Sequence, residues 1–100
     1  MMESRYRESR ICRVLGNPVV YAIVRALDEG GPMSPSAIAG VVRRRIQTVS
    51  GHLATLRASD LVRYDRKGRN ARYWIKHAPE TRRLLGGLNA LVRASARVPD

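Results

Sequence analysis

Residues 46–59 read IQTVSGHLATLRAS and have the pattern of an amphipathic helix. Four apolar residues recur at spacings of three, four and three, which predicts an amphipathic helix that ends near Ser59. These residues are Ile46, Val49, Leu53 and Leu56, and the last three are expected in the core. A helix face that is merely solvated tends toward lysine and glutamate. The other side of this helix carries mostly small or polar residues instead, namely Gln47, Thr48, Ser50, Gly51, Thr55 and Arg57. Such side chains leave little bulk between the helix and a partner, so this face is a candidate recognition surface.

Three further helices are predicted before this one. Asn17-Pro18 and Ser34-Pro35 each place a capping residue before a proline at the first helical position. They predict helices over 18–28 and 35–42, and the apolar spacing predicts another over 5–15. The residues expected to be buried are Val20, Ile23, Val24 and Leu27 in the second helix and Ile38, Val41 and Val42 in the third.

Two β-rich runs, 61–65 and 71–76, flank the sequence RKGRN at 66–70. Gly68 and Asn70 accept the positive φ of a tight turn, so we expect a β-hairpin with a cationic tip. Residues 79–96 are expected to form a last helix, whose apolar stripe consists of Leu84, Leu88 and Leu91, with Leu85 and Val92 beside it. The predicted fold class is therefore mainly α, with five helices and a small β-hairpin.

The charge of the chain indicates a polyanionic partner. Its 100 residues include 19 basic and 8 acidic ones, which gives a formal net charge of +11. Ten of the basic residues and two of the acidic ones lie between positions 43 and 76, so this third of the chain has a net charge of +8. Nucleic acid is the favoured partner.

Length and apolar content restrict the class of protein. One hundred residues are enough for one domain with a single core. The longest apolar run, residues 19–24, is far shorter than the ~20 residues of a membrane-spanning helix. The charged N-terminus lacks the apolar region of a secretory signal, and Cys12 is the only cysteine. We therefore expect no membrane contact and a cytoplasmic location.

The order of helix, short turn, helix and basic hairpin is that of a winged helix-turn-helix. The sequence LGNP at 15–18 is similar to the L-x-[DN]-P helix start of a known family, and TVSGHLATL at 48–56 is similar to its T-V-S-x-H-L-x-x-L motif. The chain resembles the ArsR/SmtB family of dimeric repressors. The resemblance implies one winged helix-turn-helix DNA-binding domain over 1–100, with the helix-turn-helix at 35–59, the wing at 61–76 and dimerisation helices at 5–15 and 79–96.

Three departures from the family pattern concern the turn and the metal sites. Residues 43–45 are arginines where the family has a Gly-Leu-Ser turn, so a helix cap and a turn glycine are missing. Asp60 stands where a glycine usually ends the helix. Ser34 and Ser36 occupy the positions of metal-binding cysteines, which implies no metal site of the known type and no cofactor, and leaves any effector unknown.

The candidate DNA-contacting residues lie on the recognition helix, in the turn before it and in the wing. Base contacts are expected from Gln47, Thr48, Ser50 and His52. Contacts to the DNA backbone are expected from Arg43, Arg44, Arg45, Arg66, Lys67 and Arg69. The dimer interface is expected to include Ile11, Leu84, Leu88 and Leu91.

Several of these residues have an alternative, structural interpretation. His52 could serve packing through a hydrogen bond to a carbonyl, the arginines could simply solubilise the turn, and the leucine stripe could complete the core of the monomer. Cys12 is expected to be a small buried apolar residue, the alternative being redox sensing through Cys12 of a second copy. Tyr73 and Trp74 are expected to pack under the wing, the alternative being stacking on single-stranded bases.

The features together predict a sequence-specific transcriptional regulator of the ArsR type that binds double-stranded DNA. It is expected to act as a homodimeric repressor on a pseudo-palindromic operator. The alternative is a winged-helix module that docks an acidic partner protein through the same basic face. The sequence shows no catalytic Ser/His/Asp or Cys/His set, carboxylate pair or phosphate-binding glycine loop, so we expect no enzyme activity.

Overall fold

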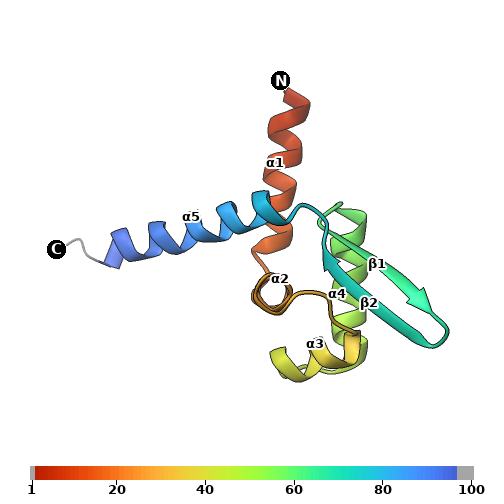
Figure 1. Ribbon diagram of the computed structural model, residues 1–100. Coiled ribbons are helices and arrows are strands. Elements are labelled where there is room, and N and C mark those ends of the chain that lie inside the picture. Colours follow the sequence, from red (N-terminus) through yellow and green to blue (C-terminus); the bar gives the residue numbers. More distant parts are fainter. Residues whose placement is uncertain (1, 97–100) are drawn as a thin grey trace.

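The computed structural model describes residues 2–96, and the remaining residues of the predicted domain lie outside the described part. Five helices and one hairpin follow the predicted order (Figure 1): α1 (Met2–Leu15), α2 (Pro18–Gly30), α3 (Pro35–Val42), α4 (Ile46–Ala58), β1 (Val62–Lys67), β2 (Asn70–Ile75) and α5 (Ala78–Ala96). The fold class predicted from the sequence is confirmed. No helix in residues 2–96 is long and apolar enough to cross a membrane.

Local capping explains where α2 and α3 begin. The side chain of Asn17 accepts hydrogen bonds from the backbone N–H groups of Val19 and Val20, at 2.9 and 3.3 Å. The hydroxyl of Ser34 accepts one from the N–H of Ala37 at 3.1 Å. Each cap precedes a proline, as predicted. Helix α2 runs two residues further than expected, and its last residue is Gly30. Gly31 caps it with a φ of 77°, which few residues other than glycine adopt.

The core is built around α2. Its buried stripe is the predicted one, and it packs against buried residues of α3, α4, β1 and α5. The cluster consists of Val20, Ile23, Val24, Leu27, Ile38, Ala39, Val49, Leu53, Leu56, Val62 and Leu85. The core thereby fixes one face of α4 inside the molecule and directs the opposite face outward.

Two residues expected in the core, Val41 and Cys12, are not there, and the apolar Ile46 is exposed as well. The buried face of α3 runs through Ile38, Ala39 and the half-buried Val42, which leaves Val41 at its side and 61% exposed. Ile46 is the first residue of α4, one turn before the core contact of Val49, and is 48% exposed. Cys12 is exposed because α1 packs against the core through its last residues instead. The predictions for Val41 and Cys12 were wrong.

The hairpin pairs β1 with β2 in antiparallel register from Val62–Ile75 to Lys67–Asn70. Two residues are left for the turn, and Gly68 has a φ of 59°. Of the two residues that could take a positive φ, only Gly68 does so, because Asn70 belongs to β2 and pairs with Lys67. A two-bond backbone bridge between Met33 and Tyr73 ties the hairpin to the loop before α3.

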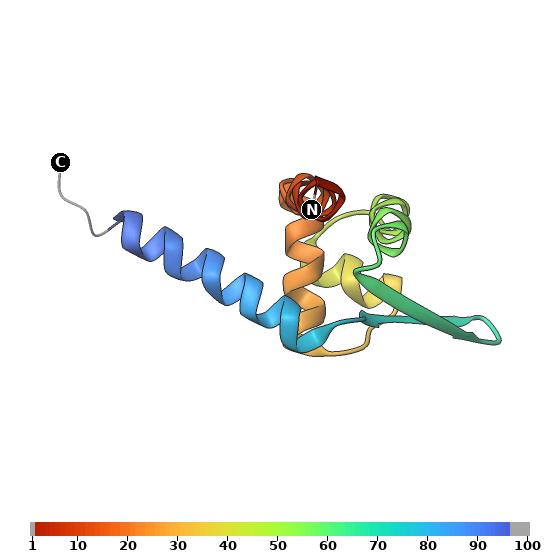
Figure 2. The same ribbon diagram turned by 90° about the horizontal axis from the view of Figure 1, so that it is seen from above.

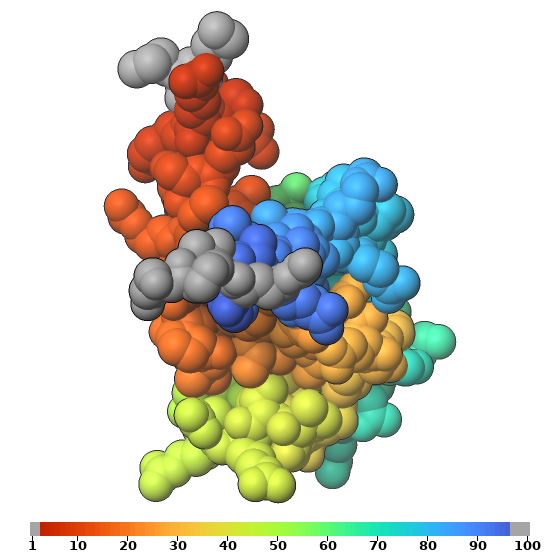
Figure 3. Space-filling model, turned by 90° about the vertical axis from the view of Figure 1, so that its left-hand side faces the viewer, coloured from red at the N-terminus to blue at the C-terminus, as the bar shows by residue number. Residues whose placement is uncertain are grey.

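Helix α5 and the hairpin extend from the body in opposite directions (Figures 1 and 2). Helix α4 lies on the hairpin side, whereas α1 projects from the body, as its red and orange atoms show in Figure 3. The helix-turn-helix and the wing thus occupy one part of the molecule, and the two terminal helices occupy another.

Candidate nucleic-acid interface

Helix α4 presents its polar face to solvent. Val49, Leu53 and Leu56 are 0% exposed and hold the helix against the core. Three of the predicted base-contacting residues, Gln47, Thr48 and Ser50, are exposed, and His52 is half-buried. Gly51 has no atom within 4 Å of the position that a Cβ would occupy, so a partner could approach the backbone of α4 closely there. The structure therefore brings the four predicted residues together within the first two turns of α4.

The turn between α3 and α4 is closed by an arginine in a left-handed conformation. Arg43 has φ 57° and ψ 52°, at the place where the family resemblance implies a glycine. The guanidinium of Arg44 donates to the carbonyl oxygen of Arg43 at 3.0 Å. Arg45 precedes the first residue of α4 and makes no side-chain capping bond. All three arginines are exposed. The turn therefore lacks a side-chain cap for α4 but carries three positive charges at the surface.

A second left-handed residue, Asp60, ends α4 with a φ of 64°. Its carboxylate accepts a hydrogen bond from the ammonium of Lys76 and lies 3.5 Å from Nε2 of His77. The hydrogen bond from Lys76 lowers the pKa of Asp60 below its ordinary value, with a smaller contribution from His77. This ion pair links the segment after α4 to the segment between β2 and α5.

An aromatic stack joins the wing to α4. The rings of Tyr64 and Tyr73 lie face to face, with centroids 5.2 Å apart and planes 17° from parallel. The guanidinium carbon of Arg57 lies 4.2 Å from the centroid of the Tyr64 ring. Tyr73 and Trp74 are half-buried, and Tyr73 packs against the core, which confirms the prediction for Tyr73. The contact of Arg57 with Tyr64 was not predicted from the sequence, because it depends on how the hairpin packs beside α4.

The six cations expected to contact the DNA backbone have no carboxylate partner within the described part of the chain. All six residues expected to contact the DNA backbone are exposed, three in the turn and three at or near the tip of the hairpin. Within residues 2–96, none of the six forms an ion pair with a carboxylate. A face with small polar groups at its centre and unpaired cations on either side is suited to a polyanion.

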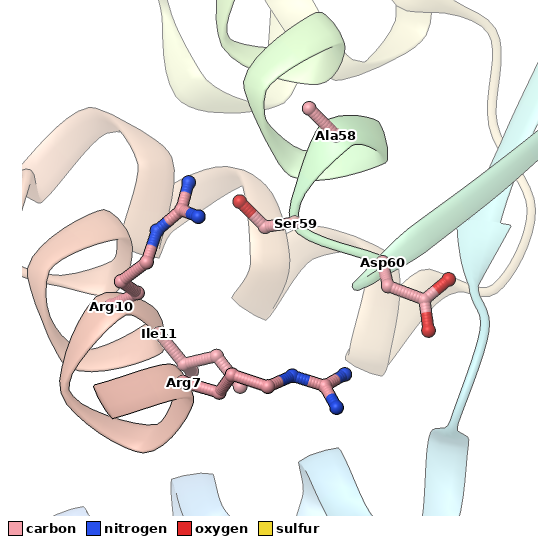
Figure 4. A pocket seen from close by; sticks show the side chains of 6 residues that line it. All are labelled: Arg7, Arg10, Ile11, Ala58, Ser59 and Asp60. Atoms are coloured by element: carbon pink, nitrogen blue, oxygen red, sulfur yellow. The ribbon is translucent and has the colours of Figure 1, made fainter. Parts of the chain in front are cut away.

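A small pocket of about 130 Å³ lies between α1 and the end of α4 (Figure 4). Arg7 and Arg10 of α1 line it from one side, and Ser59 and Asp60 from the other. In the described residues, no three histidine, cysteine or acidic side chains are grouped as metal ligands. The pocket also contains no pairing of a nucleophile with a general base.

The residues expected in the dimer interface lie on the two terminal helices. Thr81 and Leu85 of α5 point into the body and are buried. The predicted stripe of Leu84, Leu88 and Leu91 is 42%, 36% and 64% exposed. Ile11 of α1 is half-buried. Most of the apolar stripe of α5 is thus left uncovered within one chain.

Comparison with known proteins gives a family match and several similar folds. The model of the helix-turn-helix domain family matches residues 15–65. A search of curated proteins finds no match. One similar structure is the homodimeric winged helix-turn-helix domain of Mb0332 from Mycobacterium bovis, a possible ArsR-family transcriptional regulator. The two sequences are 26% identical, and the alignment covers 95% of this chain and 82% of that chain, with a TM-score of 0.74.

Two repressors share the fold at lower identity. The antimony-specific transcriptional repressor AntR is 23% identical, with 98% of this chain and 87% of that chain covered and a TM-score of 0.84. The transcriptional repressor PagR of Bacillus anthracis is 20% identical, with 88% and 99% covered and a TM-score of 0.75. These likenesses show the winged helix-turn-helix fold.

Proposed function

Because this chain belongs to the helix-turn-helix domain family, we propose that it is a homodimeric repressor that reads operator DNA through α4. It is a DNA-binding transcriptional regulator and not an enzyme. One observation above the others supports the choice of DNA-binding residues. The polar face of α4 is exposed and is flanked by six cations that have no carboxylate partner in residues 2–96.

Recognition would use the N-terminal half of α4 in the major groove. Gln47 offers a planar amide that can pair with adenine in two hydrogen bonds, and the hydroxyls of Thr48 and Ser50 can donate or accept. His52, being half-buried, would reach the groove only with its outer ring edge. The arginines of the turn and the basic residues of the wing would neutralise phosphates on either side and set the orientation of α4.

Dimerisation would follow from the uncovered stripe of α5. A two-fold dimer through Ile11, Leu84, Leu88 and Leu91 would bury these apolar side chains against the same residues of a second copy. The similar domain of Mb0332 is homodimeric. A dimer of this kind places two recognition helices about one helical turn of DNA apart, roughly 34 Å, and so requires a pseudo-palindromic operator. Its place of action would be the cytoplasm, with the DNA.

The competing proposal, docking of an acidic protein, lacks a suitable contact residue. Small polar side chains supply less energy to a protein interface than buried Tyr or Trp anchors do. The centre of the outward face of α4 carries Thr48, Ser50 and Gly51, and Tyr64 of the adjoining wing is stacked on Tyr73.

The test is selection of bound fragments from genomic DNA, followed by a footprint. We expect a protected dyad whose half-sites lie about one helical turn apart. Ser50→Ala should weaken binding to the selected site, whereas the matched change Ser95→Ala, at an exposed serine near the far end of α5, should not. Enrichment of no sequence, or equal loss in both variants, would contradict the proposal.

A further inference from the structure

Ile46 is an exposed apolar side chain at the start of the recognition helix. It is the first residue of α4, 48% exposed, and is not among the partly buried apolar residues that pack against the core. A β-branched residue has a slightly low helix propensity, and Arg45, which precedes Ile46, makes no side-chain capping bond that would help the helix to start. Neither core packing nor helix formation accounts for isoleucine at this position.

The neighbours of Ile46 place it where DNA would come closest. Arg45 precedes it and Gln47 follows it, and both are exposed. Ser50 lies four residues later, and residues at this spacing occupy the same face of a helix. Recognition helices contact base edges chiefly through their N-terminal residues. An apolar side chain there would lie among base edges and not only among phosphates.

Only one base offers an apolar group in the major groove. Thymine carries a C5-methyl, while the other bases present hydrogen-bond donors and acceptors at their major-groove edges. We propose that Ile46 packs against the C5-methyl of a thymine in each half-site and is a specificity-determining residue. This inference rests on the proposed function, because it requires α4 to enter the major groove.

Gln47 defines the base pair beside that thymine. Its amide is suited to adenine, and it follows Ile46 directly along the helix. Ile46 and Gln47 would therefore read neighbouring base pairs, one by apolar contact and the other by hydrogen bonds. An A·T-containing step in each half-site is the sequence that this arrangement recognises.

The experiment is a double-mutant cycle between the side chain and the methyl group. Wild-type protein and Ile46→Ser are titrated against the selected operator and against operators in which each symmetry-related pair of thymines is replaced by deoxyuridine, which lacks only the methyl. At one of these pairs of thymines, we expect the replacement to lower the affinity of the wild type about fourfold for each half-site, or about 15-fold for the two half-sites together. This loss corresponds to one methyl-sized group that is no longer buried at each half-site. Ile46→Ser should bind both operators equally, and Ile46→Val should retain most of the wild-type preference.

The possible results separate this inference from the one on which it rests. If the wild type prefers the operator but deoxyuridine changes nothing, or if Ile46→Ser shows the same loss as the wild type, Ile46 does not read a methyl and the proposal is overturned. If the wild type shows no sequence preference at all, the proposed function fails as well. Thermal unfolding by circular dichroism, expected to be nearly unchanged in Ile46→Ser, confirms that the fold is retained.

Discussion

Replacing Arg43 by glycine should make the protein more stable and a poorer DNA binder at once. Arg43 has φ 57° and ψ 52°, a left-handed conformation that costs a residue with a Cβ about 1–2 kcal/mol. Glycine adopts this conformation without that cost but loses about 0.5–1 kcal/mol more in conformational entropy on folding. The free energy of unfolding of Arg43→Gly should therefore rise by about 0.5–1 kcal/mol.

The assay is urea unfolding of wild type and variant at one protomer concentration, because unfolding of a dimer depends on concentration. The midpoint should rise while the slope with denaturant stays the same. Asp60→Gly is the matched comparison at the other left-handed residue, and it should gain less, because aspartate tolerates this conformation better and the variant loses its ion pair with Lys76. A lower midpoint for Arg43→Gly would refute the reasoning, since it would mean that the turn does not strain the arginine.

Three further changes test the core, the end of α4 and the dimer. Leu53→Ala removes a side chain that is 0% exposed and should lower the free energy of unfolding by about 2–5 kcal/mol in urea titrations; a loss under about 1 kcal/mol would contradict the core described above. Folding lowers the pKa of Asp60, so its contribution to the free energy of unfolding is present above its ordinary pKa of 3.8 and is lost as the pH falls through the lower pKa of the folded state. In Asp60→Asn, the free energy of unfolding should therefore depend less on pH in that acid range alone. Leu88→Glu places a charge on the uncovered stripe of α5 and should give a folded monomer by analytical ultracentrifugation, whereas a persisting dimer would move the interface elsewhere.

The sequence predicted those parts of the fold that depend on local chemistry. The caps Asn17 and Ser34 determine where α2 and α3 begin, because each satisfies backbone N–H groups within its own helix. The stripe of Val49, Leu53 and Leu56 predicted both the helix and its buried face. The missing glycines at 43 and 60 indicated irregular helix ends, and both residues are left-handed in the structure.

The parts that depend on tertiary packing were not predictable in the same way. Periodicity gives the approximate face of a helix but not where the core ends around and along it, which is why Val41 was wrongly placed inside. Cys12 was assigned to the core by residue type, although α1 contacts the core only near its C-terminal end. The stack of Arg57 on Tyr64 needs the hairpin register, which a two-residue turn fixes and the sequence alone left open.

The most direct test of DNA recognition by this face is the salt dependence of operator affinity. Six cations per subunit, all exposed and without carboxylate partners in residues 2–96, would make twelve phosphate contacts in the proposed dimer. The logarithm of the affinity should fall against the logarithm of salt concentration with a slope of about −10. A slope near −2 would contradict the account, because it would show that DNA does not meet the turn and the wing together.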